Sequence, residues 1–176
     1  MKKLLLLLVI AVSAISAKAQ VYVGGEVGFW RDYDENETIF ELVPEIGYTL
    51  SDKWAIGTKI GYGYLYKQGA KVNAMEIAPY ARYTYATFGK VNLFLDGGFG
   101  FGTYKIKGDD SSYNCLEVGI KPGLSVTLSD ELSFVAHCGF LGYRDADKGS
   151  VVSYGKNGIG FALDGNDLTF GLLFHF

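Results

Sequence analysis

Apolar and polar residues alternate with a period of two along most of the chain. Eight segments carry this pattern: 21–30, 39–50, 54–66, 75–85, 91–104, 115–128, 132–143 and 168–176. Successive side chains of a β-strand point to opposite faces, so each segment predicts a strand with one apolar face. The seventh segment alternates less clearly, with Leu132, Phe134, Cys138 and Phe140 on its expected apolar face. The segments are long enough for tilted membrane strands, which need about 9–11 residues.

Charged residues within the first six segments keep to the less apolar face. A soluble β-sandwich would also alternate, but its apolar face would point inward and its charges outward. Here the apolar face is rich in large aromatics near strand ends, and the opposite face is rich in glycine, which fits a narrow barrel lumen. We therefore expect an all-β fold, an eight-stranded antiparallel transmembrane up-and-down β-barrel. Its expected lumen charge network consists of Glu26, Glu41, Glu45, Lys59, Glu76, Arg82, Asp96, Glu117 and Lys121.

The breaks between segments alternate in length. Residues 51–53, 87–90 and 129–131 are tight, whereas 31–38, 67–74, 105–114 and 144–157 are longer and polar. Short periplasmic turns and longer outer loops are typical of membrane barrels. In the last stretch, residues 164–166 could form either a bulge or a turn. Since a turn would reverse the chain, we expect one long, bulged final strand.

The N-terminus has the pattern of a secretory signal peptide. Lys2 and Lys3 precede a twelve-residue apolar run, and Ala17 and Ala19 give the small-x-small cleavage pattern, with Gln20 as the first mature residue. The apolar run is shorter than the roughly 20 residues of a membrane-spanning helix. We expect a signal peptide at 1–19 and one barrel domain at 20–176.

Composition sharpens this reading. The chain has 24 glycines, 12 phenylalanines, 13 tyrosines and 2 tryptophans, a combination that argues against disorder and against a helical bundle. Removing Lys2, Lys3 and Lys18 leaves 13 basic and 19 acidic residues, a net charge of −6. No basic stripe remains, so we expect no nucleic-acid partner.

Several stretches carry a family resemblance. They read PEIGYTLSDKWAIGTKIGYGY at 44–64, APYARYTY at 78–85 and LTFGLLFHF at 168–176. With these stretches the chain resembles the small outer-membrane β-barrel proteins of the OmpX/OmpA-like, porin-family type, in the form common in Bacteroidetes. The resemblance covers essentially all of residues 20–176.

The resemblance implies a location in the outer membrane and contact with its lipid. It also implies that the chain's last strand is read by the outer-membrane assembly machinery. The residues similar to that assembly signal are Thr169, Gly171, Phe174 and Phe176. We further expect a monomer whose outer loops could meet an extracellular partner.

Reactive residues are few. A hairpin closing at 129–131 places Cys138 opposite position 122, about 23 Å along the strand from Cys115, whereas a disulfide needs Cα atoms within about 7 Å. His137 and His175 have Gly139 and Leu173 two residues away, not the serine that barrel-type lipid A deacylases place there. No spacing suggests a metal or cofactor site. We expect no enzymatic activity.

Four functional hypotheses remain. The first is a non-enzymatic barrel with a plugged polar lumen, serving envelope structure or surface contact through its loops. The second is a narrow, cation-leaning pore for small solutes, suggested by six lumen acids against three bases. A lipid-modifying enzyme is disfavoured by the missing His/Ser pair. A soluble, secreted, lipocalin-like binder is the fourth.

Overall fold

The structure, a computed structural model, describes residues 21–34, 36–67, 69–108, 111–147, 157–162 and 169–176. The expected signal peptide, with Ala17, Ala19 and Gln20, and the segment 164–166 lie outside these residues. Within the described ranges, no helix has the length and apolar character to cross a membrane.

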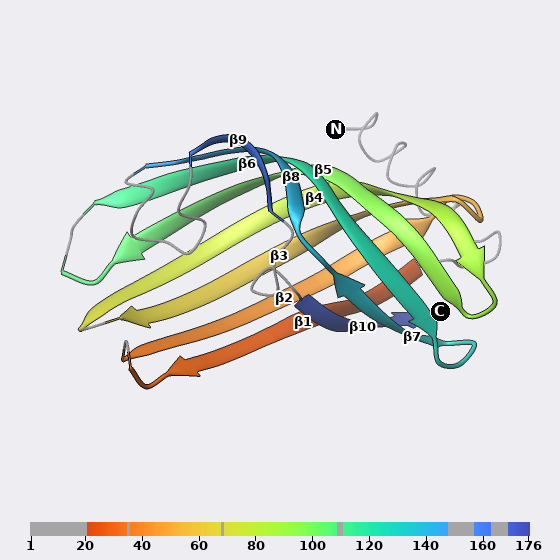
Figure 1. The fold of residues 1–176 in the computed structure, drawn as a ribbon, viewed down its shortest axis with the longest axis horizontal. Helices are drawn as coiled ribbons and strands as arrows, with labels where there is room; N and C mark the ends of the chain where they lie inside the picture. The colour runs from red at the N-terminus through yellow and green to blue at the C-terminus, as the bar shows by residue number, and fades with distance from the viewer. Residues whose placement is uncertain (1–20, 35, 68, 109–110, 148–156, 163–168) are drawn as a thin grey trace, which may run out of the picture.

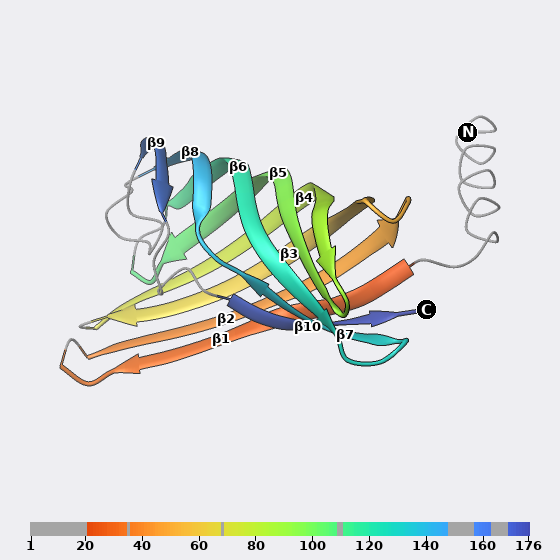
Figure 2. The same cartoon turned by 45° about the vertical axis from the view of Figure 1, so that its right-hand side comes forward.

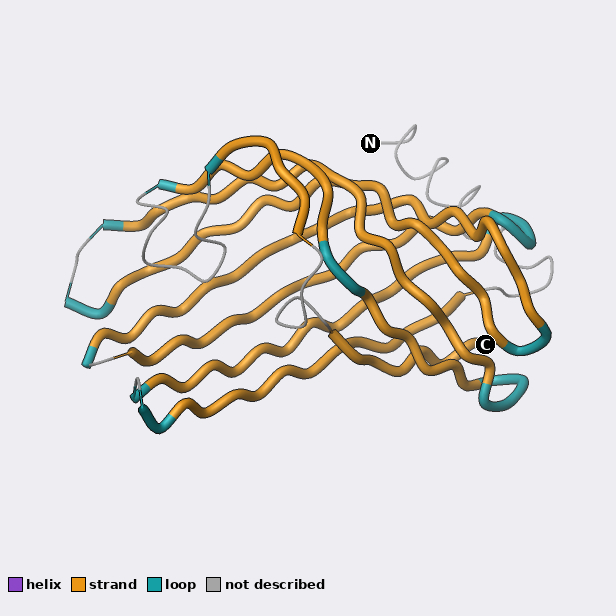
Figure 3. Tube along the Cα trace, viewed as in Figure 1, coloured by secondary structure: helices purple, strands orange, loops and turns teal. Residues whose placement is uncertain are grey.

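The described residues form ten β-strands, each antiparallel to its neighbours (Figures 1 and 3). They are β1 (Val21–Asp32), β2 (Glu37–Thr49), β3 (Trp54–Lys67), β4 (Ala70–Phe88), β5 (Val91–Ile106), β6 (Ser112–Thr127), β7 (Leu132–His137), β8 (Phe140–Ala146), β9 (Gly158–Ala162) and β10 (Thr169–His175).

These strands close into one barrel. Strands β1 to β6 pair in chain order, β6 pairs with both β7 and β8, and β10 pairs with β7 and with β1. Because β7 and β8 both run antiparallel to β6, they are two parts of the seventh barrel strand. In the same way β9 and β10 are two parts of the eighth (Figure 2). The prediction of an eight-stranded antiparallel barrel is confirmed.

The seventh strand contains a β-bulge. Gly123 pairs with His137 and Ile120 pairs with Leu141, so β6 advances three residues where the seventh strand advances four. Gly139 takes up the extra residue with a φ of 73°, a conformation that suits glycine. The shift turns Phe140 inward, where it is only 5% exposed. Placing Phe140 on the apolar outer face was therefore wrong.

The eighth strand carries a larger irregularity. Thr169 pairs with His137 and Ala162 with Phe140, so the eighth strand advances seven residues where the seventh advances three. β9 and β10 run in the same direction, as two parts of one interrupted strand do. Residues 164–166 themselves are not among those described.

The barrel has a turn end and a loop end. The turn end holds the short connections 50–53, 89–90 and 128–131, together with Val21 and Phe176, whose backbones are hydrogen-bonded at 3.0 Å. At the loop end β1 meets β2, β3 meets β4, β5 meets β6 and β8 meets β9, and there the strands run further than expected. Most of the predicted loop 67–74 belongs to β3 and β4, because polar residues such as Lys71 and Asn73 continue the strand pairing.

The barrel is apolar outside and polar inside. Outward side chains remain exposed, for example Ile60 at 50%, Phe99 at 55% and Val118 at 48%. The lumen-facing residues Glu45, Arg82 and Asp96 are each at most 7% exposed. This is the reverse of a soluble protein, as the alternation predicted.

Aromatic side chains in the lumen lie over glycines of neighbouring strands. A Cβ added at Gly123 would come within 2.5 Å of the Phe94 ring, and one at Gly119 within 2.5 Å of the Phe140 ring. A Cβ at Gly57 would come within 2.5 Å of the Tyr80 hydroxyl. The high glycine content therefore makes room for rings inside the barrel.

Replacing Gly123 with alanine tests this packing. We expect a loss of about 1–3 kcal/mol in unfolding free energy, because the new methyl group overpacks against Phe94 and the Ala136 carbonyl oxygen. The measurement is the urea concentration at which half of the protein is unfolded, monitored by aromatic fluorescence. The matched control is Gly97→Ala, since a Cβ at Gly97 meets nothing within 4 Å. Equal midpoints for the two variants would contradict this account of the lumen glycines.

Candidate functional site

The turn half of the lumen is centred on Arg82 of β4. Its Nε and Nη2 atoms donate to the two carboxylate oxygens of Asp96 on β5, both at 2.7 Å. Nη2 also donates to Glu45 on β2 at 3.2 Å. Arg82 and Asp96 are directly opposite each other in the β4–β5 pairing, so the sheet register itself sets this bidentate geometry.

His137 extends this cluster to the first and third strands. Its Nε2 lies 2.9 Å from Asp96 and its Nδ1 lies 3.1 Å from Glu26. Lys59 of β3 donates to Glu26 at 2.7 Å. We call Glu26, Glu45, Lys59, Arg82, Asp96 and His137 the plug cluster. It holds three carboxylates, two bases and one histidine, which supplies a third positive charge when protonated.

Rings surround the plug cluster on its turn-end side. The Arg82 guanidinium lies 4.1 Å from the centre of the Phe94 ring. The hydroxyls of Tyr22 and Tyr80 are 2.7 Å apart, and Tyr80 donates to Glu45. Tyr22 and Phe94 are 2% and 1% exposed, and they pack with Ala55, Val135 and Leu173. Charge and rings together fill this half of the lumen.

A second group of charges lies toward the loop end. Glu117 of β6 accepts from Lys121 at 2.6 Å and from Arg144 of β8 at 2.7 Å. The Arg144 guanidinium lies 3.9 Å from the centre of the Phe140 ring. The bulge in the seventh strand therefore places both Phe140 and Arg144 inside the barrel.

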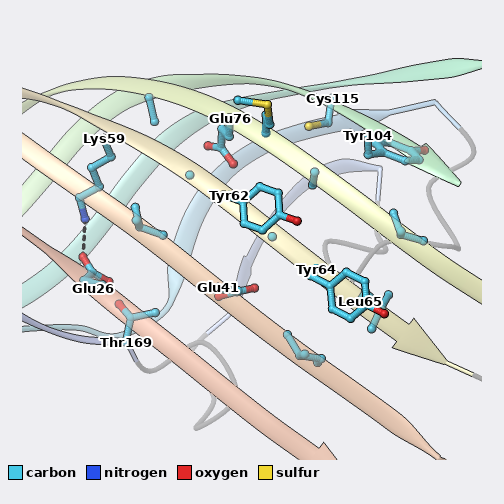
Figure 4. A pocket seen from close by; sticks show the side chains of 18 of the residues that line it. Glu26, Glu41, Lys59, Tyr62, Tyr64, Leu65, Glu76, Tyr104, Cys115 and Thr169 are labelled. Atoms are coloured by element: carbon cyan, nitrogen blue, oxygen red, sulfur yellow. Dashed lines mark hydrogen bonds and ion pairs between the residues drawn. The ribbon is translucent and has the colours of Figure 1, made fainter. Parts of the chain in front are cut away.

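A cavity of about 220 Å³ occupies the loop half of the lumen (Figure 4). Glu26, Lys59 and His137 lie at its inner end. Glu41 and Glu76 point into it from β2 and β4. Within the part of the chain that the structure describes, neither carboxylate has a salt bridge within 4.0 Å.

All nine residues of the predicted charge network lie on the inner side of the barrel. Seven of them form ion pairs, and Glu41 and Glu76 line the cavity without one. Sequence reasoning missed Arg144, because it placed this residue in the expected loop 144–157, whereas β8 runs to Ala146. The predicted network also left out the inward rings of Tyr22, Tyr80 and Phe94, because it was drawn from charged residues alone.

The C-terminal residues divide between the two faces. Phe174 and Phe176 are exposed on the outside, with ring centres 5.0 Å apart. Thr169 lines the cavity. A Cβ at Gly171 would come within 2.5 Å of the Gly25 carbonyl oxygen, so strand packing alone requires glycine there. Recognition of these residues by the assembly machinery stays a prediction.

Of the cysteines and of His175, only His175 contacts a second potentially reactive side chain among the described residues, that of Ser133. Both cysteines are free, Cys115 opposite Ala146 and Cys138 beside Pro122. His175 lies 3.1 Å from the hydroxyl of Ser133, a pair missed because the two residues are distant in sequence.

This His–Ser pair lacks the surroundings of a catalytic site. Ser133 is 8% exposed, and no described carboxylate hydrogen-bonds to His175. A catalytic serine–histidine pair needs an orienting acid and access to substrate. In the described ranges, no three His, Cys, Asp or Glu side chains are arranged to hold a metal ion.

Comparison with known proteins agrees with this architecture. The family model for the outer membrane protein beta-barrel domain matches residues 4–176. The N-terminal β-barrel domain of OprF from Pseudomonas aeruginosa is similar in fold, with a TM-score of 0.53 and 16% identity over 89% of this chain and 97% of that one.

A second solved structure is less similar. OmpT, an outer membrane protein of Vibrio cholerae in its trimer form, has a TM-score of 0.40 and 14% identity, over 89% of this chain and 52% of that one. A search of the curated proteins found no match. On the family match and the barrel together, this chain belongs to the outer membrane protein β-barrel domain family and lies in the outer membrane.

Proposed function

We propose that this protein is a non-enzymatic barrel with a plugged lumen, which serves envelope structure or contacts surface partners through its outer loops. The observation that carries the proposal is the plug cluster, which joins β1, β2, β3, β4, β5 and β7 across the turn half of the lumen. An eight-stranded barrel has an interior just wide enough for side chains. Paired charges and rings in that space leave little room for a solute.

The absence of enzymatic activity is part of the proposal. The His175–Ser133 pair is the arrangement nearest to a catalytic one in the described residues; it is partly buried, and no described carboxylate hydrogen-bonds to His175. We also propose that the protein works as a monomer in contact with outer-membrane lipid, and that its last strand is the assembly signal. Loop residues such as Tyr33, which is 85% exposed, are then available to an extracellular partner.

Planar-bilayer conductance tests the plug. We expect no steady unitary current from the wild-type protein at either polarity. The double variant Arg82→Ala/Asp96→Ala removes both sides of the central ion pair and is expected to conduct. A shift in gel mobility on heating checks that each protein is folded. Steady, reproducible unitary currents from the wild type would contradict the plugged barrel.

A narrow, cation-leaning pore is the second candidate. Glu41 and Glu76 favour it, because unpaired carboxylates in a lumen attract cations. The same recordings decide between the two candidates. A reproducible wild-type current whose reversal potential shifts toward that of the cation would support the pore.

A further inference from the structure

The floor of the loop-half cavity is bare backbone. Gly61 and Gly63 of β3 both line the cavity. A Cβ at Gly61 would approach only the Glu76 Cβ, at 3.5 Å, and one at Gly63 only the Ala74 Cβ, at 3.6 Å. These are ordinary contacts, so protein packing does not require glycine at either place. In this they differ from Gly119 and Gly123, whose Cβ atoms would clash with rings.

The two unpaired carboxylates flank this floor on opposite sides. Glu41 of β2 lies directly across from Gly63, and Glu76 of β4 lies directly across from Gly61. The outer strands of the three are about 9–10 Å apart, because neighbouring strands are spaced by about 4.8 Å. Two negative groups thus lie on either side of an uncovered strip of β3, with the Glu76 carboxylate over Gly100 of β5 and the Glu41 carboxylate beside Gly28 of β1.

Among the described residues, no base comes within salt-bridge distance of either carboxylate. On the same strand faces, Glu41 is flanked by Ile39 and Val43, and Glu76 by Ala74 and Ala78, all of which line the cavity. The three bases that line the cavity are paired with other carboxylates: Lys59 with Glu26 at 2.7 Å, and Lys121 and Arg144 both with Glu117, at 2.6 and 2.7 Å. Partly buried charges without a partner are costly, so a cation in the cavity would lower their free energy.

We propose that the loop half of the lumen is a binding site for a short aliphatic diamine. One ammonium group pairs with Glu41, the other pairs with Glu76, and the methylene stem lies over Gly61 and Gly63 against the apolar walls. A diamine matches two separated carboxylates in charge and has an apolar stem between its charges. The site does not depend on whether the lumen conducts.

Titration of the folded protein in detergent micelles with butane-1,4-diamine tests the site, by calorimetry and by amide NMR shifts of Gly61 and Gly63. We expect saturable binding at least tenfold tighter than that of butylamine, and no binding of butane-1,4-diol. Glu41→Gln and Glu76→Gln should each lower the diamine affinity about tenfold, to the level of butylamine. These two carboxylates lie outside the plug cluster, so the variants leave its ion pairs intact.

Filling the floor gives a second test. Gly63→Leu should abolish diamine binding, whereas Gly97→Leu, the same change on the outer face of β5, should leave it unchanged. Heat-dependent gel mobility shows that both variants are folded. Four results would each overturn the proposal. They are butylamine binding as tightly as the diamine, displacement of the diamine by Mg²⁺ at equal concentration, diamine binding that survives Gly63→Leu, and no diamine binding at all. None of these results bears on the conductance of the plug, so the two proposals fail separately.

Discussion

Replacing Arg82 with methionine is expected to lower the free energy of unfolding by about 3–5 kcal/mol, the usual cost of breaking a buried ion pair from one side. The change leaves Asp96 and Glu45 without their guanidinium partner, and these residues are 5% and 3% exposed. Methionine keeps much of the volume of the arginine stem, so the loss reports mainly on charge. The measurement is the urea concentration at which half of the protein in lipid vesicles is unfolded, with heat-dependent gel mobility as the probe of folding.

Three variants control this result. Lys53→Met removes a base from an exposed turn and should change the unfolding free energy by less than about 0.5 kcal/mol. Arg82→Lys keeps the charge but loses the bidentate geometry, so its effect should be intermediate. Arg82→Met/Asp96→Leu removes both partners and should recover part of the loss. If Arg82→Met unfolded at the wild-type urea concentration, the plug cluster would not stabilise the barrel.

Arginine in place of Ile60 is expected to destabilise the barrel in membranes by about 2–4 kcal/mol, as arginine does at the midplane of a bilayer. Ile60 lies near the middle of β3, points outward and is 50% exposed. Its neighbours Lys59 and Gly61 face the lumen, so the substitution changes only the lipid-facing side. The measurement is the same urea midpoint in vesicles.

The control for Ile60 is a substitution at a different depth in the membrane. Phe88→Arg places the same charge at the turn end of β4, where the side chain is 67% exposed, and should cost only about 0–1 kcal/mol. Similar losses at the two positions would mean that the outer face of the barrel does not cross the bilayer in this orientation.

Most of the fold could be predicted because one physical rule governs it. Every side chain of a barrel strand faces either lipid or lumen, so alternation alone assigned Glu26, Arg82 and Glu117 to the inner side. The rule failed where the alternation of faces was interrupted by a bulge. One extra residue beside Gly139 reversed the faces beyond it, and no residue type in the sequence marks a bulge uniquely.

Less of the lumen could be predicted, because ion pairs across a barrel depend on register between distant strands. Arg82 and Asp96 share a hairpin, so their pairing was within reach of a register argument. The contact of His137 with Glu26 depends on how the seventh strand lies against the first across the lumen. Ser133 and His175 likewise meet only because β10 pairs with β7. Neither contact has a local sequence signal.

The contacts of the plug cluster are expected to form in a definite order during folding, because they join strands at different distances along the chain. Arg82 and Asp96 can pair as soon as the β4–β5 hairpin forms, because they are cross-strand neighbours. Glu26 and His137 are 3.1 Å apart only after the first and last strands have met. Contacts between residues so distant in sequence form late, since long loops must close first. Closure of the barrel is therefore coupled to formation of the last contacts of the plug cluster.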